Sequence, residues 1–204
     1  MMQQRKLGQN GPAIHPIGIG AMSFSDFYGE TTEAASHAIL DAAIEAGVNH
    51  IDTSNVYGMG RSEQAIGSYL KSRPEARDFF SIATKASITR DADTGRRYFD
   101  NSPAHLEAEL DQSLTRMGVD AVDLFYVHRR DPEVPIEEVT ETLAALVRSG
   151  KTHSIGYSEI APASLRRAHA VHPVAAVPSS LSLFGETPSI QPQKAVRHLV
   201  TQSE

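Results

Sequence analysis

The sequence contains no cysteine, which excludes disulfide bonds, thiolate nucleophiles and cysteine metal ligands. It also lacks any run approaching the ~20 apolar residues that span a bilayer, and no apolar signal segment follows its first six residues. We therefore expect a cytoplasmic protein that makes no contact with membranes.

The sequence also has no excess of basic residues, since its formal net charge is −6 at pH 7. This balance offers no electrostatic footprint for nucleic acid or for an anionic membrane surface. The one basic cluster, Arg166-Arg167 with His169, falls in a helix-like stretch and is interpreted as a solvated face. We expect no nucleic-acid partner.

The chain of 204 residues, 40% hydrophobic and 22% charged, has the composition of a single globular domain. Short apolar runs, each about the length of a buried strand, alternate along it with amphipathic segments. The runs cover residues 17–20, 48–51, 80–83, 123–127, 154–157 and 174–177. We expect each run to form a strand of a parallel sheet.

Helices with readable ends separate several of these runs. One begins at the N-cap Ser102, followed by Pro103, and its apolar stripe ends before Gly118. Two others are expected over about 32–46 and from about Pro135 to Gly150. Helices that end on glycine shortly before a strand favour an α/β fold.

Two parallel architectures fit this order, which begins with a predicted hairpin at an Asn10-Gly11 turn. A doubly wound sheet would carry G-x-G-x-x-G after its first strand, but the sequence after Gly18-Ile19-Gly20 lacks the third glycine. A barrel instead gathers reactive residues at the carboxyl ends of several strands. We predict an α/β fold of the (β/α)₈ TIM-barrel type, with about six βα units present.

Candidate reactive residues stand at the ends of the predicted strands. They are Asp52 and Tyr57 after the second, Lys85 after the third, His128 at the end of the fourth, and Ser158-Glu159 at the end of the fifth. Because the carboxyl ends of barrel strands meet at one rim, we expect these side chains to lie close together.

Such residue types suit the reduction of a carbonyl group. A phenol titrates near about 10, and a neighbouring ammonium favours the phenolate, which makes the phenol a better general acid. A carboxylate can hold the ammonium in place, and an imidazole can orient the carbonyl. The set contains no activated nucleophile and no metal cage, so a hydride from a reduced nicotinamide is the natural partner of the proton.

The chain resembles the aldo-keto reductase family over about residues 7–177. Asp52-Thr53-Ser54-Asn55-Val56-Tyr57-Gly58 is similar to that family's D-T-x-x-x-Y-G signature. Thr84-Lys85 looks like its T-K segment, and residues 123–128 resemble its D-L-x-x-x-H segment. Four residues of the right kinds thus occur in order at four matching places.

The resemblance implies an NADP-dependent oxidoreductase that reduces a small aldehyde or ketone. It implies Tyr57 as proton donor, Lys85 and Asp52 as the pair that tunes it, and His128 as the residue that orients the carbonyl. NADP(H) would contact Gly20, Ala21, Met22, Asp52, Ser158 and Glu159. No metal is expected, and the polar stretch 87–100 is predicted as a long loop over the barrel mouth.

From Pro178 the sequence departs from the family, whose members usually carry a Q-x-E-Y-S-L-like run there. We expect one domain over 1–204 with an irregular tail from about 178, truncated before two further βα units. An open barrel would leave strand edges that could pair with another chain. An inactive fragment, or a cofactor-binding interaction module, is the alternative to an active reductase.

Overall fold

The computed structural model describes residues 3–8 and 11–178. Its centre is one parallel sheet with the strand order β10-β9-β8-β5-β4-β3. The strands are β3 (Ile19–Gly20), β4 (His50–Asp52), β5 (Ser81–Ala86), β8 (Leu124–Val127), β9 (Ile155–Tyr157) and β10 (Val174–Ala176). The six predicted strands are confirmed, and within the described residues they form an incomplete barrel with β3 and β10 at its edges.

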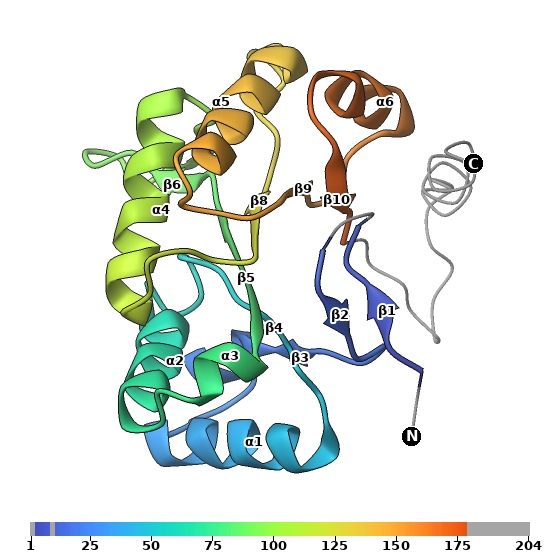
Figure 1. Cartoon of the computed structure of the whole chain (residues 1–204). Coiled ribbons are helices and arrows are strands. Elements are labelled where there is room, and N and C mark those ends of the chain that lie inside the picture. The colour runs from blue at the N-terminus through green and yellow to red at the C-terminus, as the bar shows by residue number, and fades with distance from the viewer. Residues whose placement is uncertain (1–2, 9–10, 179–204) are drawn as a thin grey trace, which may run out of the picture.

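Helices ring the outer side of this curved sheet, and a small hairpin lies on its inner side (Figure 1). The helical segments are η1 (Ala21–Ser25), α1 (Glu33–Ala46), α2 (Arg61–Ser72), α3 (Ala76–Phe79), α4 (Pro103–Met117), α5 (Ile136–Arg148) and α6 (Pro162–Val171). The three predicted helices are confirmed as α1, α4 and α5. At two of their N-caps, the Thr32 and Ser102 hydroxyls accept hydrogen bonds from backbone N–H groups.

The predicted N-terminal hairpin consists of β1 (Arg5–Lys6) and β2 (Ala13–Ile14), and part of its turn lies outside the described residues. Asn49, just before β4, accepts from the His15 N–H at 2.8 Å and donates to the Ala13 carbonyl at 3.0 Å. Leu7 packs in a cluster with Ala83, Leu124 and Tyr126. The hairpin therefore covers the amino-terminal end of the sheet and leaves the carboxyl end open.

The prediction of a long loop over residues 87–100 was wrong. The structure has an antiparallel hairpin there, formed by β6 (Ile88–Arg90) and β7 (Arg97–Phe99). Most of its side chains are exposed, so the sequence shows no apolar alternation that would have indicated strands. The irregular tail predicted from about 178 falls almost wholly on residues 179–204, which lie outside the described residues.

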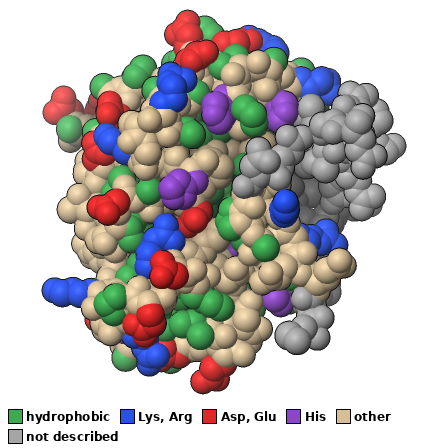
Figure 2. All heavy atoms as spheres, in the orientation of Figure 1, with side chains coloured by type: hydrophobic (Ala, Val, Ile, Leu, Met, Phe, Trp, Pro, Cys, Tyr) green, Lys and Arg blue, Asp and Glu red, His purple; other side chains and the backbone are tan. Residues whose placement is uncertain are grey.

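The surface mixes both signs of charge, with acidic and basic side chains interspersed on the face drawn in Figure 2. Arg166 and Arg167 are exposed, which confirms the predicted solvated face. The Arg167 guanidinium donates to both carboxylate oxygens of Glu137, at 2.6 and 2.7 Å. Among the described residues, no helix has the length and apolar character needed to cross a bilayer.

A buried ion pair joins α2 and α4 to the central strand β5. Glu63 of α2 is fully buried, and its carboxylate accepts from Arg116 Nε at 2.6 Å and from Thr84 Oγ1 at 2.5 Å. The helices can approach closely because a Cβ at Gly67 would collide with the backbone of Arg116 and Met117. This contact holds β5 in place one residue before Lys85.

Replacement of Arg116 by methionine should strongly destabilise the fold. It leaves the Glu63 carboxylate buried without its counter-ion, and breaking a buried pair in this way costs about 3–5 kcal/mol. The free energy of unfolding in urea is the measurement. Arg73→Met, which removes a surface pair with Asp41, is the control and should cost less than about 1 kcal/mol. Equal losses in the two variants would contradict this role.

Candidate active site

The sequence-predicted reactive residues meet at the carboxyl ends of the strands. Asp52 ends β4, Lys85 lies within β5, and His128 and Ser158 directly follow β8 and β9. Tyr57 stands in the connection from β4 to α2. All five line one cleft of about 1130 Å³. The parallel register therefore brings together side chains up to about a hundred positions apart in the sequence.

Lys85 is placed inside the barrel by the alternation of β5. Successive side chains of a strand point to opposite faces, so Thr84 meets Glu63 of a covering helix while Lys85 turns inward. The Lys85 side chain is 4% exposed, and its ammonium forms an ion pair with Asp52 and donates to the Thr53 carbonyl at 2.8 Å. The buried charge is thus neutralised and hydrogen-bonded, as burial requires.

Tyr57 is held next to this ammonium. Its hydroxyl oxygen lies 3.5 Å from Lys85 Nζ, and its ring meets the His128 ring edge-on, with centroids 6.0 Å apart. The Gly-Met-Gly sequence at 58–60 follows with φ of 60, 53 and 92°, a tight left-handed turn that leads into α2.

His128 is neutral in this environment. Burial lowers its pKa to about 3, and the nearby charges of Lys85, Arg129 and Arg97 act in the same direction. Its Nδ1 lies 3.1 Å from the hydroxyl of Ser54, which is fully buried. Nε2 is then the ring nitrogen left to meet a ligand. Sequence reasoning missed Ser54 because it occupies a variable position of the signature.

The predicted cofactor contacts divide into two groups. Gly20, Met22, Ser158 and Glu159 line the same cleft as the reactive residues. Ala21 does not line the cleft, because it is fully buried in the core. Its carbonyl accepts a hydrogen bond from the Ser62 hydroxyl at 2.8 Å, which ties η1 to α2.

Arg129 is a further cleft residue that the sequence did not indicate. Its Nη1 donates to Ser158 Oγ at 3.1 Å and to the His128 carbonyl at 2.7 Å, and its Nη2 lies 3.3 Å from the Glu159 carboxylate. It thereby links the segment after β8 to the segment after β9. Among the described residues, no group of three His, Asp or Glu side chains is placed to hold a metal ion.

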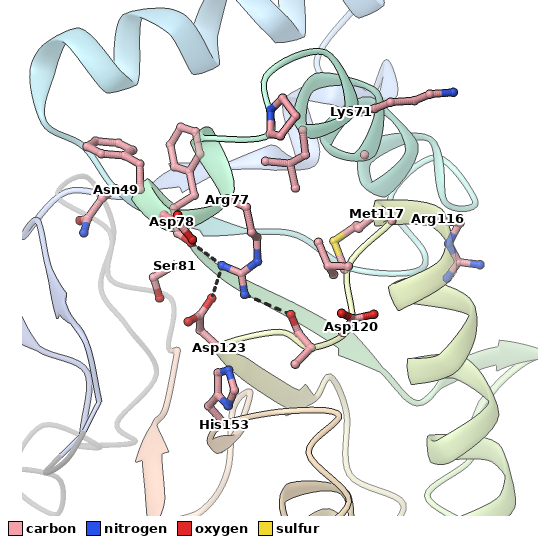
Figure 3. Close-up of a pocket in the computed structure, with 18 of the residues that line it drawn as sticks. Asn49, Lys71, Arg77, Asp78, Ser81, Arg116, Met117, Asp120, Asp123 and His153 are labelled. Carbon is pink, nitrogen blue, oxygen red and sulfur yellow. Dashed lines mark hydrogen bonds and ion pairs between the residues drawn. The ribbon is translucent and has the colours of Figure 1, made fainter.

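A second hollow, of about 1040 Å³, lies near the amino-terminal ends of the strands (Figure 3). Arg77 of α3 lies across it, donating to the carbonyls of Phe80 at 2.9 Å and Ala121 at 3.1 Å and pairing with Asp123 at 3.2 Å. These contacts tie α3 to the start of β8. None of the predicted reactive residues lines this hollow.

Residues 16–201 match the family model described as the Aldo/keto reductase family. The chain belongs to this family. It is 38% identical over 196 residues to the aldo-keto reductase yakc [NADP(+)] of Schizosaccharomyces pombe, covering 95% of this chain and 57% of that protein. It is 40% identical over 186 residues to the aldo-keto reductase str7 of Strobilurus tenacellus, covering 88% and 52%.

Solved structures share the fold. The holo form of aldo-keto reductase AKR11C1 from Bacillus halodurans superposes with a TM-score of 0.82 at 26% identity, covering 97% of this chain and 64% of that one. The glycerol dehydrogenase AKR11B4 from Gluconobacter oxydans gives 0.79 at 27% identity, covering 98% and 66%. The chain therefore spans about half the length of the curated relatives that it matches, and just under two thirds of these structures.

The buried imidazole of His128 should make stability depend on pH. Its pKa of about 3 lies below the ordinary value of 6.5, so the unfolded chain takes up the proton first as the pH falls. Its contribution to the free energy of unfolding is complete above about pH 6.5 and falls by up to about 1.4 kcal/mol per pH unit below that, towards pH 3.

His128→Gln should therefore lose stability less steeply than the unmutated chain between about pH 6.5 and pH 4. Urea unfolding at several pH values measures the difference, and groups that titrate in both proteins cancel in it. Parallel pH profiles for the two proteins would show that His128 does not titrate as described.

Proposed function

We propose that this chain carries the active site of an NADP(H)-dependent reductase that converts an aldehyde or ketone to an alcohol. The observation that carries the proposal is the contact of three groups at one rim: the Tyr57 hydroxyl beside the Lys85 ammonium, which is itself paired with Asp52. Membership of the aldo/keto reductase family supports the same reaction class.

The protein's part in the reaction is to supply a proton and to stabilise the charge that remains. When bound, a dihydronicotinamide supplies the hydride that joins the carbonyl carbon. The Tyr57 hydroxyl donates its proton to the carbonyl oxygen, and the Lys85 ammonium stabilises the negative charge left on the phenolic oxygen. Asp52 holds that ammonium in position through their ion pair. Tyr57 regains a proton from solvent, which completes the balance.

His128 can orient the carbonyl because it is a neutral imidazole. For Nε2 to donate to the carbonyl oxygen, Nδ1 must accept a hydrogen bond, and the Ser54 hydroxyl at 3.1 Å is placed to give it. Ser54 would thereby select the tautomer that the reaction needs. The role is positional, since Ser54 acts through His128.

The residues present fit a nicotinamide cofactor. A Cβ built on Gly20 meets no atom within 4 Å, so the backbone at the end of β3 faces open space in the cleft. The Ser158 hydroxyl accepts a hydrogen bond from Arg129. Among the described residues, this hydroxyl donates to no acceptor, so its hydrogen can be donated to the carbonyl oxygen of a carboxamide. Glu159 brings a carboxylate to the same place, suited to the amide N–H groups. One similar protein carries NADP(+) in its name.

Tyr57→Phe should abolish most of the turnover. Removal of a general acid lowers the rate by about 10²–10⁴ fold, while the ring and its contact with His128 remain. Oxidation of NADPH with an aromatic aldehyde, followed by absorbance, is the measurement. Tyr98→Phe, which removes a hydroxyl from the exposed side of β7, is the control and should leave the rate unchanged. Equal rates for Tyr57→Phe and the unmutated chain would refute the assigned role, and a folded chain without turnover would refute the proposed function.

A further inference from the structure

Two arginines lie side by side at the mouth of the cleft. Arg90 of β6 and Arg97 of β7 are directly opposite each other in the hairpin, and both line the cleft. Like charges in such cross-strand pairs are destabilising. Residues two apart share a face of a strand, so Arg90 lies on the same face as Ile88, which is buried against the protein. The hairpin thus carries two like charges side by side on the face that borders the cleft, where both side chains are solvent-exposed.

The other cations of the cleft are already paired. Lys85 pairs with Asp52, Arg116 with Glu63, and Arg129 with Glu159. Arg90 and Arg97 differ from these. Arg90 donates to the Gly95 carbonyl at 3.1 Å, and Arg97 lies 6.0 Å from the centre of the Phe99 ring. Within the described part of the chain, neither guanidinium has a carboxylate at ion-pair distance.

The cleft therefore differs in charge from the molecule around it. Five of its lining side chains are cationic and three are carboxylates; with Glu63, which pairs with Arg116 from outside the lining, the excess is one positive charge, while the whole chain has a net charge of −6. The third carboxylate, Glu109, accepts a hydrogen bond from Asn55 at 2.6 Å. A cationic cleft in an acidic protein concentrates anions at that place.

Arg97 is within electrostatic reach of the reactive groups. Its charge is one of those that lower the pKa of His128, after burial and the charges of Lys85 and Arg129. An anionic group bound at Arg97 would then lie close to a carbonyl held by Tyr57 and His128. The same guanidinium pair would offer planar, bidentate hydrogen bonding to that anion.

We propose that Arg97, with Arg90 beside it, makes this cleft select carbonyl substrates that carry a carboxylate or a similar anionic group. That the bound molecule is a substrate rests on the proposed reductase function. The preference for an anion rests on the arginine pair and the charge of the cleft, and does not depend on that function. Arg90 and Arg97 determine specificity, and the proton and hydride chemistry stays with the residues described above.

The test compares 4-carboxybenzaldehyde with its neutral counterpart methyl 4-formylbenzoate, each titrated into the full chain and followed by NMR without cofactor. The carboxylate should bind about tenfold more tightly, as a charged hydrogen bond contributes. Arg90→Gln with Arg97→Gln should reduce this ratio to about one. Raising the salt concentration to about 0.5 M should also lower the ratio, because the added ions screen the exposed charges. Arg96→Gln removes the same charge from the same hairpin but does not line the cleft, and should preserve the ratio.

Equal binding of acid and ester by the unmutated chain, or no saturable binding of the acid, overturns the inference. The same holds if the Arg90 and Arg97 variant keeps the ratio but binds NADPH more weakly, because the arginines would then hold a cofactor phosphate. A preference for the acid together with no reduction of either aldehyde would sustain the inference while refuting the proposed function. The two failures are therefore distinguishable.

Discussion

The buried ammonium of Lys85 is the constraint on which the arrangement of this end of the sheet depends. A lysine that is 4% exposed needs a counter-ion and hydrogen-bond acceptors, because an unpaired buried charge is far too costly. Asp52 and the Thr53 carbonyl supply them from the neighbouring strand. Tyr57 is a further neighbour of this ammonium and lines the cleft.

The same charge sets the state of His128. An imidazole buried next to an ammonium and an arginine stays neutral, and a neutral imidazole can act as a directional donor through one nitrogen while the other is fixed by Ser54. The site thus combines a proton donor, a stabilising cation and an orienting group without a nucleophile. Such a combination favours reduction of a carbonyl over hydrolysis or group transfer.

Features determined by neighbouring residues in the sequence could be predicted. The six strands are short apolar runs, of which β5, β8 and β9 are buried along their whole length. Helices α1 and α4 follow the N-caps Thr32 and Ser102, whose hydroxyls accept from the backbone N–H three residues later. The predicted βα units imply a helix after the second strand, but no bounds were predicted for α2. Its buried face includes Ser62, Glu63 and Gly67, whose burial depends on α4 and β5, far away in the sequence. The same face also buries Ile66 and Leu70, so the apolar signal of this segment is real but interrupted by polar residues.

The residues of the candidate site also fall into those that the sequence indicated and those that only the folded structure reveals. Residue types and their order indicated Asp52, Tyr57, Lys85 and His128, because parallel strands bring their carboxyl ends to one rim. The contacts of Ser54 with His128 and of Arg129 with Glu159 depend on side-chain positions that only the folded chain defines. The hairpin over residues 88–99 was taken for a loop because its mostly exposed side chains show no apolar alternation.

Transfer of deuterium from the cofactor to the carbonyl carbon would test the reaction at this site. The 204-residue chain would be given an aromatic aldehyde and NADPH that carries deuterium at both C4 positions of the nicotinamide. We expect an alcohol with deuterium on the former carbonyl carbon, while its hydroxyl proton comes from solvent through Tyr57. An alcohol without deuterium at that carbon, or no alcohol from a folded chain, would refute hydride transfer at this site.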